Sequence, residues 1–169
     1  IYEFCQDQDE DFRVAYIHSK GTFHQWEDGR NDRWRRHGTV AATGEMCLNP
    51  SDDSCNVCGL QFWTNWSFFY PGNFFTAKCS YVKKLIPPES YEDRMTELTK
   101  DTLLMRVKGS LSMNLFSDRI DRYGLYRYAM EAWIGGHPTI QPCDVSKTND
   151  LMYWLNNDHN TDEEFEFAM

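Results

Sequence analysis

The sequence lacks any run of about 18 apolar residues, so no membrane-spanning helix is expected. It contains no P-loop, no G-x-G-x-x-G fingerprint and no nucleophile elbow, which excludes the commonest nucleotide-binding and hydrolase motifs. A dense stripe of Lys and Arg is also missing, and duplex nucleic acid is therefore not expected as a partner. What is present is a chain of 169 residues that is 41% hydrophobic and 15% aromatic, enough for one domain with a real core.

Acidic residues are abundant, but they concentrate at the two ends. The formal charge is −9, and residues 1–12 and 158–169 together hold ten Asp and Glu with no Lys or Arg. The remaining 16 acidic residues are balanced by 17 Lys and Arg. We therefore expect solvated acidic ends around a nearly neutral domain, which is compatible with an anionic ligand such as a nucleotide diphosphate.

The start of the chain shows no signal peptide, and its first residue is Ile rather than Met. We therefore expect a fragment of a longer protein, and both the cytoplasm and the lumen of the secretory pathway remain open as its location.

Six cysteines are present, at positions 5, 47, 55, 58, 79 and 143. Cys55-x-x-Cys58 with Cys47 offers three ligands of a structural zinc, whereas such a site needs four. Disulfides and buried free thiols are the alternatives.

Hydrophobic periodicity and turn residues predict alternating helices and strands. Pro87-Pro88 should end one helix, Ser90 and Asp93 resemble a capping box that opens the next, and Gly135-Gly136 should end another. The expected helices are 1–8, 29–47, 78–86, one from Ser90 onward, and 125–134, and the expected strands are 13–18 and 57–63.

Three segments place polar groups where an apolar element meets a loop. They are His18-Ser19-Lys20-Gly21 after the apolar strand Val14–Ile17, then Tyr70-Pro71-Gly72-Asn73-Phe74-Phe75, then Arg127-Tyr128-Ala129-Met130-Glu131-Ala132-Trp133-Ile134. In order and spacing they resemble a glycosyltransferase-like family with a GT-A type fold. Its members carry a "YIH-S/T-KG" strand end, a "GNFWWA"-like segment and an aromatic-rich helix with an internal Glu.

This resemblance covers residues 1 to about 145 and implies an α/β protein. The implied fold is part of a three-layer GT-A domain with a mostly parallel sheet. We expect residues 1–147 to form that domain without its N-terminal part, and residues 148–169 to form a C-terminal helix and acidic tail.

The strand end His18–Gly21 stands where many enzymes of this fold carry a metal-binding Asp-x-Asp. Lys20 can supply positive charge to a phosphate directly, and Gly21 lets the backbone approach the ligand. The resemblance therefore predicts His18, Lys20 and Gly21 as substrate-binding residues. No residue is predicted as a metal ligand, and a divalent metal, left open as a cofactor, is not supported by an Asp-x-Asp at this strand end. The alternative is an ordinary polar strand end.

Gly72 and Asn73 are predicted to bind substrate as well, because an amide suits sugar hydroxyls. Phe74 and Phe75 are expected to stack on a sugar or, alternatively, to form a core strand. Trp133 and His137 complete the predicted substrate-binding set, although His137 also suits a capping or structural role.

Glu131 lies on a helix that is otherwise apolar on several sides. Desolvation would raise the pKa of its carboxyl toward that of a general base, and the resemblance implies that it deprotonates the acceptor hydroxyl. The alternative is a salt bridge to Arg127 or another Arg.

Two hypotheses for function follow. The first is a glycosyltransferase with a nucleotide-sugar donor and a glycan or other hydroxyl acceptor. The second is a non-catalytic carbohydrate-binding or interaction domain of the same fold.

Overall fold

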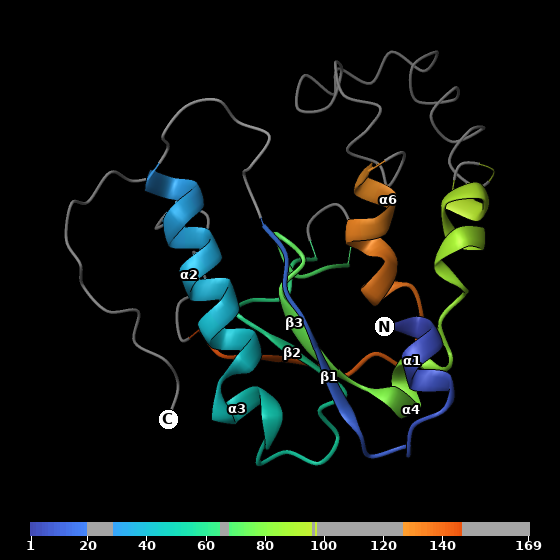
Figure 1. Ribbon diagram of the computed structural model, residues 1–169, viewed down its shortest axis with the longest axis horizontal. Helices are drawn as coiled ribbons and strands as arrows, with labels where there is room; N and C mark the ends of the chain where they lie inside the picture. Colours follow the sequence, from blue (N-terminus) through green and yellow to red (C-terminus); the bar gives the residue numbers. More distant parts are fainter. Residues whose placement is uncertain (20–28, 65–67, 96, 98–126, 147–169) are drawn as a thin grey trace.

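The computed structural model describes residues 1–19, 29–64, 68–95, 97 and 127–146. They form a mixed α/β domain with a four-stranded sheet, shown in Figure 1. The predicted C-terminal helix and tail, 148–169, lie outside the described residues. In the described part of the chain, no helix is long and apolar enough to cross a membrane.

The sheet has the strand order β1-β3-β2-β4. Its strands are β1 (Arg13–Tyr16), β2 (Val57–Gly59), β3 (Phe75–Lys78) and β4 (Pro142–Asp144). β3 pairs antiparallel with both β1 and β2, whereas β2 and β4 are parallel. The expectation of a mostly parallel sheet was therefore wrong, because β3 is inserted in the opposite direction between its two neighbours.

The inversion of β3 still leaves β1, β2 and β4 running the same way. β1 and β2 are both antiparallel to β3, so they run in the same direction, and β4 is parallel to β2. The carboxyl ends of three strands thus meet the amino end of β3 at one edge of the sheet. We call this the carboxyl edge.

Helices cover both faces of the sheet (Figure 1). α2 (Gly29–Thr43) contacts β1, β2 and β3 on one face and continues into α3 (Glu45–Leu48). On the other face, α4 (Cys79–Val82) follows β3 and contacts α1 (Tyr2–Gln6), and α6 (Arg127–Ala132) continues into the 3₁₀ turn η2 (Trp133–Gly135).

Alternation along the strands sends side chains into two separate cores. Phe75 and Ala77 of β3 join the larger core with Tyr70, Tyr81 and Ile134. From the opposite face of β3, the hydroxyl of Thr76 donates to the carbonyl of Ala42 on α2. The smaller core lies on this α2 side and holds Ala41, Leu60, Val145 and three of the cysteines.

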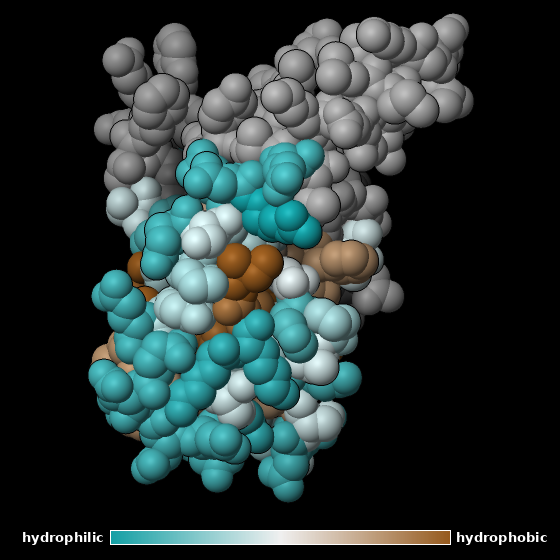
Figure 2. Space-filling model, turned by 90° about the vertical axis from the view of Figure 1, so that its right-hand side faces the viewer, coloured by the Kyte–Doolittle hydropathy of each residue, from teal (hydrophilic) through white to brown (hydrophobic). Residues whose placement is uncertain are grey.

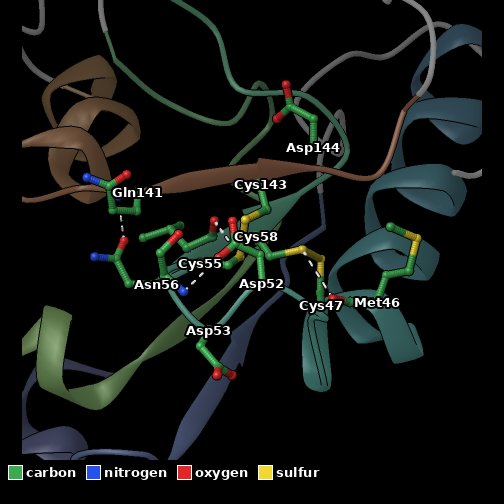
Figure 3. Close-up of a disulfide and its surroundings, with 12 residues drawn as sticks. Met46, Cys47, Asp52, Asp53, Cys55, Asn56, Cys58, Gln141, Cys143 and Asp144 are labelled. Carbon is green, nitrogen blue, oxygen red and sulfur yellow. Dashed lines mark hydrogen bonds between the residues drawn. A yellow bond between two sulfur atoms is a disulfide. The ribbon is translucent and has the colours of Figure 1, made fainter.

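All six cysteines are paired. Cys5 is bonded to Cys79, Cys47 to Cys58, and Cys55 to Cys143. The disulfide alternative is thus confirmed, and zinc ligation by Cys47, Cys55 and Cys58 is not what the structure shows. Figure 3 shows the last two disulfides close together, between α3, β2 and β4.

Several element boundaries differ from the expected ones. Residues 88–95 are helical, so this helix begins at Pro88 rather than behind a cap at Ser90. Proline suits the first turn of a helix because its missing N–H needs no partner there. The backbone N–H groups of Ser90 and Tyr91 both donate to the carbonyl of Pro87. The helix expected at 78–86 is the single turn α4, since Lys78 still belongs to β3.

We expect the Cys5–Cys79 bond to contribute more stability than the Cys47–Cys58 bond. Both pairs are buried, but they span 74 and 11 residues of sequence. Each bond restricts the unfolded chain, and a longer loop is restricted more. When each pair is replaced by two alanines, we therefore expect the free energy of unfolding to fall by about 4.5 kcal/mol and about 3 kcal/mol respectively. Urea unfolding of the two matched double variants measures the difference. An equal loss in both would show that local packing, and not loop closure, sets their contributions.

Candidate functional site

The carboxyl edge brings together two segments that the sequence singled out. Tyr16 at the end of β1 lies opposite Phe75 at the start of β3. His18 and Gly72-Asn73 therefore become neighbours although they lie more than fifty residues apart. Open α/β sheets bind their ligands outside the carboxyl ends of strands, which makes this edge the candidate functional site.

A tight turn shapes the site. The N–H of Asn73 donates to the carbonyl of Tyr70 at 2.8 Å, which closes a four-residue turn around Pro71 and Gly72. Gly72 has φ 82°, and the proline-glycine pair with this φ is typical of a type II turn. Asn73 follows at φ 62°, a left-handed conformation that asparagine tolerates better than most residues.

Neighbouring elements hold this turn from two sides. The indole N–H of Trp34 on α2 donates to the carbonyl of Pro71 at 2.9 Å. A side chain at position 72 would meet that indole nitrogen at 2.9 Å, so only glycine fits beneath it. Two residues beyond β1, the imidazole Nε2 of His18 bonds to the carbonyl of Gly72, and its ring stacks on Phe74 with centroids 5.2 Å apart.

The phenylalanines that follow the turn belong to the core. Phe74 and Phe75 are 2% and 1% exposed. A side chain on Gly38 of α2 would lie 2.7 Å from the Phe74 ring, so the helix packs directly on it. Both residues are thus buried in the core and support the turn, and Phe75 begins the strand β3.

The side-chain amide of Asn73 has an oxygen that receives no hydrogen bond within the described part of the fold. Its Oδ1 is buried, and none of the residues that the structure describes donates a hydrogen bond to it. A buried acceptor without a donor costs about 1–3 kcal/mol. Such a group indicates a donor supplied by a ligand or water.

Asp144 is a residue at this edge that sequence analysis missed. It ends β4, its Oδ1 accepts a 2.6 Å hydrogen bond from the N–H of Phe62, and Figure 3 shows its carboxylate pointing away from the disulfides. Burial raises the pKa of Asp144 to about 6. Burial and the Asp144 carboxylate also raise the pKa of Tyr70 well above its usual value. The strand escaped detection because it has three residues and begins with Pro142.

His37 on α2 is another titratable group that folding perturbs strongly. It is 7% exposed, and burial, followed by the positive charges of Arg36 and Arg33, lowers its pKa to about 4. The imidazole is therefore neutral at physiological pH. The same two arginines make this part of α2 cationic.

The remaining predicted residues belong to other elements or lie outside the described part. Trp133 is 5% exposed in the larger core, and its indole N–H donates to the carbonyl of Ile86 at 2.7 Å, which favours packing over ligand contact. Glu131 is half-buried on α6. His137 accepts from the N–H of Thr139 at Nδ1, a local capping role. Lys20 and Gly21 lie outside the described residues.

These features define an α/β domain with a candidate ligand site at the carboxyl edge of a mixed sheet. The chain belongs to a family described as a domain of unknown function, DUF8361, whose model matches residues 1–169. No curated protein matches the chain. No solved structure matches it either. Family membership defines no reaction, so the geometry of the site carries the functional proposal.

Asp144 and His37 should give the folding free energy opposite dependences on pH. The folded pKa of His37 is lowered, so its contribution is present above about pH 6.5 and is lost as the pH falls toward 4. The folded pKa of Asp144 is raised, so its contribution is present below about pH 3.8 and is lost as the pH rises through 6. Between pH 4 and 6 the two effects oppose each other.

Urea unfolding of His37→Gln and Asp144→Asn across pH 4–7 separates the two contributions. Relative to the parent protein, His37→Gln should lose stability as the pH rises, whereas Asp144→Asn should gain it. Differences from the parent that stay constant with pH would contradict both assignments.

Proposed function

We propose that this chain is part of a glycosyltransferase-like domain of GT-A type that transfers a sugar from a nucleotide-sugar donor to a hydroxyl acceptor. The observation that carries the proposal is the unpartnered Oδ1 of Asn73 beside His18 at the carboxyl edge. A sugar hydroxyl is a donor of the kind that this buried acceptor lacks. The edge itself is where open α/β sheets hold ligands.

The cationic part of α2 supports an anionic donor. α2 follows β1 in the chain, and Figure 1 shows its first turn toward the carboxyl edge. Arg33 and Arg36 carry positive charge along this half of the helix. With Lys20 after the β1 strand end, these charges suit the diphosphate that a nucleotide-sugar donor releases.

The proposed reaction is a displacement at the anomeric carbon. The acceptor oxygen forms the new bond to that carbon while the bond from the carbon to the diphosphate oxygen breaks. In an inverting mechanism, the carboxylate of Glu131 takes the acceptor's proton, and Lys20 offsets the negative charge that develops on the leaving diphosphate. Asn73 and His18 position the sugar.

Sugar binding without transfer is the second candidate function. The groups gathered at the turn are an amide, an imidazole and backbone carbonyls, which suffice for recognition by hydrogen bonding. A transfer assay beside a binding assay distinguishes the two candidates, since both need Asn73 and only transfer needs Glu131.

The three disulfides bear on where this function takes place. Structural disulfides persist in oxidising compartments and are rare in the cytosol. Of the two locations left open by the sequence, they favour the lumen of the secretory pathway.

Replacing Asn73 tests ligand binding apart from backbone conformation. Asn73→Gly keeps the left-handed backbone and removes the amide, so we expect stability to hold while sugar or nucleotide-sugar affinity falls about 5- to 30-fold. Asn73→Asp keeps an acceptor oxygen in the same place and should bind better than the glycine variant. Calorimetric titration with a panel of nucleotide sugars and free sugars measures both. Unchanged affinity in Asn73→Gly would remove Asn73 from the site.

Glu131→Gln tests the catalytic assignment. The amide is nearly isosteric, so the melting temperature should hold while transfer falls by roughly 10²–10⁴-fold, the usual loss of acid–base catalysis. Glu92→Gln, an exposed position on the 88–95 helix, is the matched control and should leave the transfer rate unchanged. A Glu131 variant with a lowered melting temperature and normal transfer per folded molecule would make Glu131 a structural residue.

A further inference from the structure

A cavity of about 510 Å³ lies on the opposite side of the sheet from α2, beside the end of α6. The described residues of its lining come from three places in the chain: Phe68, the segment from Ile86 through the 88–95 helix, and the end of α6 with the η2 turn and the residues that follow it. This volume is within the range of small-molecule sites in proteins. The cavity is built from elements other than those that form the Asn73 turn.

Most of the lining is apolar or aromatic. Phe68, Ile86, Tyr91 and Ile140 all line the cavity, and Phe68 and Ile86 are 56% and 40% exposed at its rim. Figure 2 shows this side of the molecule, where brown apolar residues lie surrounded by teal hydrophilic ones. The body of a fitting ligand is therefore apolar.

The polar groups of the lining are donors. Arg94 contributes a guanidinium, and only one of its terminal nitrogens bonds to Glu97. His137 accepts the Thr139 N–H at Nδ1, so its other ring nitrogen, Nε2, carries the proton in the neutral ring. The hydroxyl of Tyr91 already donates to the carbonyl of Ala132. None of the described residues that line the cavity carries a carboxylate.

An apolar floor with a cation and a donor suits one class of ligand. We propose that this cavity binds a small apolar molecule with an anionic end, a carboxylate or a phosphate, whose charge meets Arg94 and His137. The binding is independent of sugar transfer and requires neither Asn73 nor Glu131.

Decanoate and decanol are the probes, because they share the apolar body and differ in charge. Calorimetric titration of the intact protein should show decanoate binding at least about threefold more tightly than decanol, through a charge-assisted contact at a partly exposed site. Equal affinities, or no binding of either probe, would overturn the proposal.

Two variants of the exposed Arg94–Glu97 ion pair provide a matched comparison. Both Arg94→Gln and Glu97→Gln break this 3.0 Å pair at the same small cost to the helix. Arg94→Gln should abolish the preference for decanoate and leave decanol binding unchanged. Glu97→Gln should keep or increase the preference, because it releases the guanidinium. The same behaviour in both variants would show that Arg94 does not meet the anion.

A substitution at the rim tests the location. Ile86→Asp places a negative charge in the lining and should weaken decanoate binding more than decanol binding. Val40→Asp, at a similarly exposed position on α2 outside the cavity, should change neither. Sedimentation with anionic phospholipid vesicles, in the absence of decanoate binding, would assign the surface to a membrane instead and would also overturn the proposal.

Discussion

The pairing of β3 between β1 and β2 is the constraint on which the rest of the structure depends. All four residues of β3 lie opposite a β1 residue, and three of them also lie opposite β2. Phe75 and Ala77 build the larger core, while Thr76 ties the strand to α2. Because β3 runs against its neighbours, the turn that precedes it is delivered to the edge where β1 and β2 end. A parallel β3 would have placed Asn73 at the opposite edge.

Sequence patterns predicted helices and strands correctly where the local signal agreed with the contacts made in the folded chain. The strand at Val14, the helix that begins at residue 29 and the stop at Gly135-Gly136 all correspond to structure. These predictions depended on periodicity and glycine chemistry, which act within a few residues. The direction of β3 depended on contacts across the chain, which periodicity does not report.

The candidate site shows the same limit. His18, Gly72 and Asn73 were found as separate motifs, and the strand pairing brings them together. Trp34 was not predicted to belong to the site, since nothing local indicates that its indole N–H holds the carbonyl of Pro71. Trp133 illustrates the opposite case. An aromatic residue beside a functional motif suggested ligand contact, although the burial of a large indole with a satisfied N–H serves the core.

One disulfide and one side-chain hydrogen bond hold the edge of the sheet that lies opposite the candidate site. The Cys5–Cys79 bond follows the carboxyl end of β3, and Arg13 at the start of β1 donates to the carbonyl of Cys55 at 2.6 Å. Both lie at the edge opposite Asn73. The candidate site, by contrast, is held by hydrogen bonds from Trp34 and His18 and by a tight turn.

This division separates stability from recognition. The disulfides restrict the unfolded chain wherever they lie, so they need not approach the ligand to stabilise the fold. The turn at Gly72 and Asn73 is rigid for a local reason, because a left-handed backbone braced by an indole admits few alternatives. An acceptor such as Asn73 Oδ1 can therefore be held desolvated and ready, since the rest of the sheet supplies the stability that this unpaired group costs.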